Sequence, residues 1–324
     1  MSNTTEKTYN SLPLIKKEHR NKVLITLFLV TALAGGGYWA VIAATSSSAP
    51  PVALALRLAY IAVLYMPVPL YTLLLGRFML GIPIPFRALL SLKHITVKKY
   101  ALVAGLFLAW AVLMIGSVAV LGWLWPDTFG HLATTNGHLV HNLEKLIGAS
   151  VDTSAMNMPP TPLAMLPLGI FGALMAGLTV NAIFAMAEEI MWRGYLAQAF
   201  AGRPFCKKYV TIGVLWGLWH IPLIALGYNY GTANALPGSV LFIGFCVVMS
   251  LVLGFVVERT RSVWLAAVLH GTFNGFSQVM LLLVVGGSSL LASSAVGVVS
   301  LVAWLVVFVA CYISTAFASV TERA

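Results

Sequence analysis

The chain has 324 residues, of which 60% are hydrophobic and only 9% are charged. A soluble domain carries about 25% charged residues, so this composition excludes a soluble protein with an ordinary solvated surface. A formal net charge of +10 would suggest nucleic acid as the partner of a soluble protein. In so apolar a chain it instead indicates basic loops on one side of a membrane, so we expect membrane lipids and no nucleic acid as partners.

The first apolar run follows a polar, basic segment, residues 1–22, and continues to about Ala44. The apolar stretch of a secretory signal is only about 7–15 residues long. We therefore interpret this run as an uncleaved first transmembrane helix.

Eight stretches are long and apolar enough to span a bilayer as helices, which takes about 20 residues. Spanning strands need only about 9–11 residues, so these lengths predict an all-α polytopic helical bundle. The predicted spans are residues 23–45, 53–76, 99–124, 162–187, 209–228, 237–257, 263–285 and 295–317.

The placement of Lys and Arg predicts the orientation of the chain. With eight spans and a cytoplasmic N-terminus, all of the 19 basic residues except Arg57 and Lys145 fall in cytoplasmic segments. We therefore expect both termini in the cytoplasm of a multi-pass protein of a bacterial inner (plasma) membrane. The long cytoplasmic connection, residues 77–98, has the composition of an interfacial segment, and residues 125–161 form the longest outer loop.

Ionisable residues inside spans are costly and usually functional. Only Glu188 and Glu189, among the acidic residues, lie in an otherwise apolar helical run, and only His220 and His270, among the histidines, lie within predicted spans. At 1.5 Å per residue the three helices can bring these groups together in the cytoplasmic half of the bilayer. Three pairs four residues apart share a helix face: Glu189 with Arg193, Trp216 with His220, and His270 with Asn274.

A carboxylate, two imidazoles and an amide are sufficient for peptide hydrolysis. A buried Glu can take a proton from water, and a His can position that water or share the proton. A second His and an Asn amide can donate hydrogen bonds to the developing oxyanion. Arg193 can hold Glu189 as an electrostatic support.

In this order, and each on a separate membrane helix, these motifs resemble those of the CPBP intramembrane proteases, the CAAX-prenyl-protease and bacteriocin-processing (Abi) family. The resemblance implies a membrane endopeptidase in which Glu188 and His220 activate water, while His270 and Asn274 form the oxyanion site. It also implies that Glu189 and Arg193 support the first motif. The second motif usually opens with Phe in the family, and here Trp216 stands in that place.

The resemblance covers roughly residues 162–285 and divides the chain into three parts. Residues 1–161 form an N-terminal membrane region, residues 162–285 the protease-like core, and residues 286–324 a final span with a short tail. The expected substrate is a membrane-associated or lipidated peptide that is cut near the cytoplasmic face.

Two alternatives concern the chemistry of the site. If a divalent metal such as zinc is present, Glu188, His220 and His270 would supply an open ligand set, although the chain has no HExxH sequence. The same residues suit a metal-free glutamate mechanism, which we prefer.

A second class of function is a non-catalytic membrane protein, such as an immunity factor, a scaffold or a transporter. Each polar motif alone is compatible with a charged helix end or with hydrogen bonds between helices. A transporter more often shows repeated halves and broken helices, and the sequence predicts neither.

The remaining polar candidates are interpreted without function. Outer-loop His131, His138 and His141 lack the neighbouring Cys or acidic residues of a metal site and are expected to be solvated. Cys206, Cys246 and Cys311 form no CxxC pair and are expected to be small buried residues.

Overall fold

The structure is a computed structural model that describes residues 15–92, 95–154, 156–287 and 290–321, with the backbone alone from residue 315 onward. The described part is a helical bundle, in which 79% of the described residues are helical. The predicted fold class is therefore confirmed. Basic Lys7, Lys93 and Arg323, which contribute to the predicted orientation, lie outside the described residues.

Seven helical segments are each long and apolar enough to cross a membrane, and one further bent pair of helices raises the number to eight among the described residues. The spanning segments are α2 (Lys17–Ala44), α3 with η1 and α4 (Pro50–Tyr60, Ile61–Tyr65 and Val68–Phe78), α6 (Val97–Leu124), α9 with α10 (Met165–Leu178 and Val180–Glu189), α12 (Phe205–Ala225), α13 (Ala235–Thr260), α14 (Val263–Leu283) and α16 (Val298–Thr321).

Short elements connect and extend these spans. The π-helix η3 (Ile190–Leu196) and α11 (Ala197–Ala199) continue α10 without interruption. The other short elements are α5 (Phe86–Leu89), α7 (Pro126–Phe129), α8 (Asn136–Ile147), α15 (Leu290–Ser293) and the 3-10 turns η2 (Pro162–Ala164) and η4 (Thr232–Asn234). Between α7 and α8, β1 (His131–Leu132) pairs antiparallel with β2 (Val284–Val285), which directly follows α14.

The fourth predicted span, residues 162–187, is not one straight helix. It breaks at Thr179, whose backbone leaves the helical region, and its two halves meet at an angle of 55°. Helical structure then continues to Ala199, past the end expected from the sequence. The structure therefore contains a broken helix that the sequence did not predict. The argument against a transporter from the lack of broken helices no longer holds.

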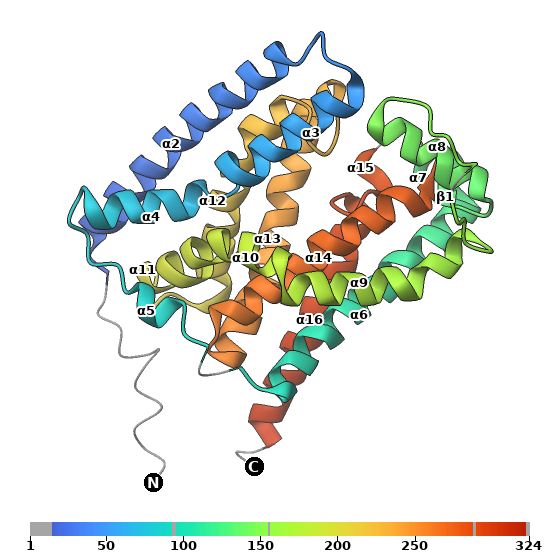
Figure 1. Cartoon of the computed structure of the whole chain (residues 1–324). Coiled ribbons are helices and arrows are strands. Elements are labelled where there is room, and N and C mark those ends of the chain that lie inside the picture. Colours follow the sequence, from blue (N-terminus) through green and yellow to red (C-terminus); the bar gives the residue numbers. More distant parts are fainter. Residues whose placement is uncertain (1–14, 93–94, 155, 288–289, 322–324) are drawn as a thin grey trace.

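The helices approach closely where glycines face a neighbouring backbone. A Cβ atom at Gly271 of α14 would lie 2.7 Å from the carbonyl carbon of Asn181 in α10, and one at Gly213 of α12 would lie 2.5 Å from the Cα of Val247 in α13. Figure 1 shows α9 and α10 crossing α14, with α2, α3 and α4 on one side of the bundle and α6 and α16 on the other. This packing brings the helices that carry the polar motifs into direct contact.

Candidate active site

The two glutamates are the last residues of α10. They lie deep in the bundle and not at an exposed helix end at a membrane interface. Glu188 is 4% exposed and Glu189 is fully buried. The chain passes directly from Glu189 into the π-helix η3, and such widened turns often occur at functional sites. A buried carboxylate is costly unless it is paired, so the partners of these two groups determine what they can do.

Glu189 is held by two hydrogen-bond donors. Its Oε1 atom accepts a hydrogen bond from Nη1 of Arg193 at 3.0 Å and another from Nδ1 of His270 at 2.9 Å. The first contact is the pair predicted from the i, i+4 spacing, and Arg193 is also fully buried. The second contact, from α14, was not predicted. It fixes the His270 ring, because a carboxylate only accepts hydrogen bonds and Nδ1 must therefore carry the proton.

Glu188 is held by Trp216, whose indole Nε1 donates to its Oε2 atom at 2.9 Å. The Arg193 guanidinium carbon lies 4.3 Å from the centre of a Trp216 ring, a cation–π contact. Trp216 thus connects the two glutamates, and a Phe in its place would keep a ring but remove the donor to Glu188.

His220, one turn further along α12, is oriented by its own helix. Its Nδ1 lies 3.0 Å from the carbonyl oxygen of Trp216. A carbonyl oxygen only accepts, so Nδ1 is the donor and Nε2 of the neutral ring is left as an acceptor. The ring packs against Trp219 and Phe242, with centroid distances of 4.4 Å and 4.6 Å, which restricts its rotation.

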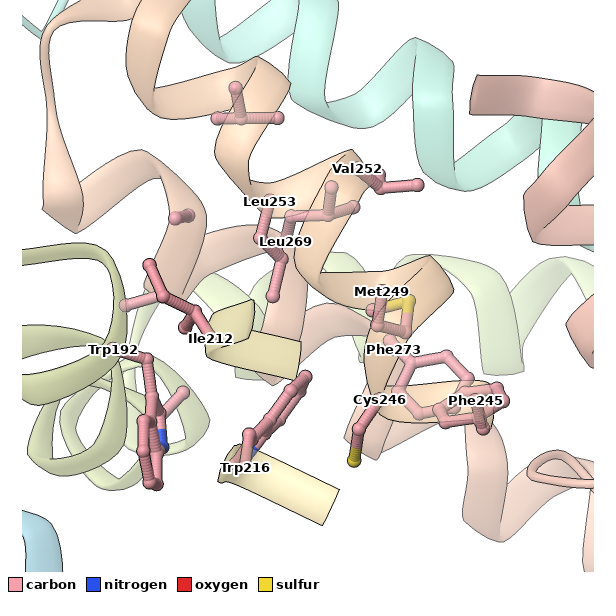
Figure 2. Packing of buried hydrophobic residues seen from close by; sticks show 14 of the residues in the cluster. Trp192, Ile212, Trp216, Phe245, Cys246, Met249, Val252, Leu253, Leu269 and Phe273 are labelled. Atoms are coloured by element: carbon pink, nitrogen blue, oxygen red, sulfur yellow. The ribbon is translucent and has the colours of Figure 1, made fainter. Parts of the chain in front are cut away.

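One cavity of about 390 Å³ collects the four predicted catalytic residues: Glu188, His220, His270 and Asn274. Asn274 is the exposed member of the set, whereas the two histidines are each only 5% exposed. Trp216 also lines this cavity, but Glu189 and Arg193 do not. Figure 2 shows Trp216 and Cys246 among the packed buried hydrophobic side chains, and both residues line the cavity.

Further polar residues that the sequence did not single out line the same cavity: Asn181, Tyr228, Asn229, Ser277 and Gln278. Ser277 and Gln278 continue the α14 face of His270 and Asn274, a spacing that could have revealed them. No sequence signal identified Tyr228 and Asn229, which were expected only at a span end and in a turn. In the structure their loop is anchored by Tyr230, whose hydroxyl donates to the carbonyl of Val296 at 2.7 Å.

The donor set has the chemistry of a zinc site but not the arrangement. Glu188, His220 and His270 offer a carboxylate and two imidazoles, and the hydrogen bonds of His270 Nδ1 and Glu188 Oε2 leave the second ring nitrogen and the second carboxylate oxygen available as ligands. Among the described residues, no three His, Cys, Asp or Glu side chains are placed to hold one metal ion. The reaction steps proposed below accordingly use protein groups and water.

The histidines of residues 125–161 lie outside this cavity, whereas Cys246 is one of its lining residues. The rings of His131 and His138 are 5.4 Å apart at 73°, and the His138 Nδ1 atom accepts a backbone N–H from Thr134. Of the three free cysteines, Cys246 is buried as expected, but Cys206 is exposed and Cys311 is partly exposed. The expectation of three buried cysteines is therefore wrong for Cys206 and Cys311.

The fold and the cavity describe a multi-spanning helical membrane protein with a polar cavity between its helices. Residues 166–276 match the family model described as "Type II CAAX prenyl endopeptidase Rce1-like". The CAAX prenyl protease 2 of Methanococcus maripaludis is 28% identical over 95 residues, which are 28% of this chain and 35% of the relative. The family match thus confirms the resemblance inferred from the three motifs for residues 166–276. The alignment with the archaeal relative covers about a third of that relative's length.

The buried ion pair predicts a specific pattern of stability. In Arg193→Met, Glu189 keeps only His270 as a hydrogen-bond partner, and breaking a buried pair typically costs about 3–5 kcal/mol. We expect the free energy of unfolding in detergent micelles to fall by that amount. The double variant Glu189→Met, Arg193→Met should regain most of the loss, because no uncompensated carboxylate is left.

The matched control is Arg203→Met, since Arg203 is exposed and stacks only on Phe200. It should unfold like the wild type. A double variant that is no more stable than Arg193→Met would contradict the proposed pairing.

Proposed function

We propose that this chain is an intramembrane endopeptidase that hydrolyses a peptide bond of a membrane-associated or lipidated substrate near the cytoplasmic face of a bacterial plasma membrane. The observation that carries the proposal is the single cavity lined by Glu188, His220, His270 and Asn274. Four polar groups from three helices share that cavity in a bundle that is otherwise apolar. Groups of this kind in spanning helices generally mark a functional site.

The first step is activation of water by Glu188. Trp216 holds the Oε2 atom of Glu188, so the other carboxylate oxygen is the one available to accept a proton from water. The bare Nε2 of His220 can accept the second hydrogen of the same water and orient its lone pair toward the substrate carbonyl. Glu188 is the general base, and His220 is the group that positions the nucleophile.

The second step is stabilisation of the oxyanion by α14. His270 donates to Glu189 through Nδ1, and an ionised carboxylate at that position stabilises the imidazolium form of the ring. The imidazolium then carries a proton on Nε2, which can donate to the oxyanion together with the Asn274 amide. Glu189 and Arg193 thus act through His270, without lining the cavity themselves.

The last step returns the proton. Collapse of the tetrahedral intermediate breaks the C–N bond, and the proton that Glu188 took from water passes to the leaving amine nitrogen. The products are a carboxylic acid and an amine, which become a carboxylate and an ammonium once the acid proton passes to the amine through water, and Glu188 is again ionised. One carboxyl group serves as base and then as acid, so the cycle needs no further titrating residue.

The comparisons support a prenylated peptide as the proposed substrate class. The matched family and the archaeal relative are both described by the CAAX motif, in which a C-terminal cysteine carries a prenyl chain. The cavity offers an apolar lining beside its polar residues, with Leu58, Ile61, Met66 and Phe184 among the lining side chains. An apolar chain attached to a short peptide fits this combination.

A non-catalytic membrane role, such as transport, is the second candidate. The observation that favours it is the bent pair at Thr179, because discontinuous helices line the binding sites of many transporters. Cleavage of a peptide by the purified protein separates the two candidates.

Glu188→Gln and His220→Ala should each abolish cleavage, because the first removes the base and the second the group that positions water. The assay follows release of the C-terminal tripeptide from a farnesylated CAAX peptide by purified protein in lipid nanodiscs, and thermal unfolding checks that each variant is folded. The control is His141→Ala, an exposed histidine that does not line the cavity. Wild-type cleavage by either of the first two variants would remove the catalytic assignment.

Trp216→Phe should lower kcat with little change in KM, because Glu188 loses its hydrogen-bond donor while the cavity keeps an aromatic wall. A hydrogen bond to a charged group contributes about 1.5–3 kcal/mol, which corresponds to a fall of roughly ten- to a hundredfold in kcat. Trp304→Phe is the control, since its indole N–H has no hydrogen-bond partner among the described residues. Equal kcat values for the two variants would show that Trp216 does not position Glu188.

Prior incubation with a metal chelator should leave the cleavage rate unchanged, because no three ligand side chains are arranged around one point in the described residues. The rate is measured over a range of chelator concentrations, with and without added zinc. A loss of activity that zinc restores would establish a metal mechanism in place of the metal-free one.

A further inference from the structure

One face of α14 presents polar side chains to the cavity at regular intervals. His270, Asn274 and Gln278 are four residues apart, and all three line the cavity. At 1.5 Å rise per residue, successive members lie about 6 Å apart along the helix axis. These three residues are called the α14 polar row below.

Two members of the α14 polar row keep their amides free. Asn274 and Gln278 are both exposed, and neither amide makes a hydrogen bond to another described residue. Their neighbours differ, since Ser277 donates to the carbonyl of Phe273 at 2.8 Å and Asn181 donates to the carbonyl of Gly271 at 3.1 Å. An amide left without a protein partner in a spanning helix is unfavourable in hydrocarbon, so a ligand in the cavity is the natural partner.

The spacing of the row identifies what kind of ligand fits it. An extended polypeptide rises about 3.3 Å per residue, so backbone groups that face the same side recur about every 6.6 Å. This repeat is close to the 6 Å spacing of the row. A carboxamide both donates and accepts, so it can bind the N–H and the C=O of a single residue.

We propose that the α14 polar row binds the backbone of an extended substrate segment, and that Gln278 is a positioning residue that pairs with the substrate residue two places from the scissile bond. The distance follows from the geometry: if Asn274 contacts the scissile carbonyl, one further interval of about 6 Å corresponds to about two extended residues. This inference rests on the proposed peptidase function, and it adds that recognition is through the substrate backbone. Side chains of the substrate then face the apolar lining.

The experiment measures binding separately from cleavage. The probe is a fluorescently labelled, farnesylated CAAX peptide, together with variants in which each backbone amide is N-methylated in turn. Affinity is measured by anisotropy with Glu188→Gln protein, which binds but does not cut. Kinetics of the parent peptide are measured with wild-type protein and with Gln278→Met.

We expect Gln278→Met to raise KM about fivefold to tenfold with little change in kcat, the effect of one lost hydrogen-bonding group. N-methylation two residues from the scissile bond should weaken binding to Glu188→Gln by a similar factor. The same N-methylation should not weaken peptide binding to the Glu188→Gln, Gln278→Met protein any further. The control is Leu281→Met, an exposed α14 residue that does not line this cavity.

Three outcomes decide between the two proposals. The backbone row is overturned if N-methylation two residues from the scissile bond does not weaken peptide affinity more than N-methylation elsewhere. It is also overturned if the affinity profile is the same in the Glu188→Gln protein and in the Glu188→Gln, Gln278→Met protein. Cleavage by the wild type would still support the peptidase. If the predicted profile appears but the wild type cuts no probe, the row is supported and the proposed hydrolysis is wrong. Should Gln278→Met fail to fold, the profile of the Glu188→Gln protein alone still tests the row.

Discussion

The pairing of the buried Glu189 carboxylate with Arg193 and His270 is the interaction on which the site depends. In an apolar bundle a fully buried carboxylate is stable only with partners, and Glu189 has two, Arg193 and His270. These contacts fix the ring of His270 and bring the guanidinium over Trp216, whose N–H in turn holds Glu188. Glu189, which does not line the cavity, therefore orients His270 directly and acts on Glu188 through Arg193 and Trp216.

The close approach of α14 to α9 and α10 makes this network possible. Gly177 and Gly271 allow backbone contacts that any side chain would prevent, and the break at Thr179 turns α10 across α14 (Figure 1). As a result, Glu189 is paired beside the cavity, while Glu188 in the cavity is held by a single donor. In the proposed mechanism, this difference between the neighbouring glutamates separates the supporting residue from the base.

The sequence predicted the helices and the four cavity residues because both follow from local patterns. Apolar length indicates a span, and an i, i+4 spacing places His270 and Asn274 on one face. The break at Thr179 could not be predicted, since no Pro marks it and the contact of Gly177 with Thr272 is formed by residues far apart in the chain. Tyr228 was missed for the same reason, because its loop is anchored to Val296. The catalytic roles, the three-part division and the orientation stay predictions.

The pairing of Glu189 with Arg193 within one helical run bears on how the protein is made. His270 lies 81 residues later in the chain than Glu189, so it is synthesised well after α10 and η3. During that interval the i, i+4 partner is already present, and it lowers the cost of transferring both charges into lipid. The same short-range ion pair that later orients a histidine thus first lets its own segment partition into the bilayer during translation.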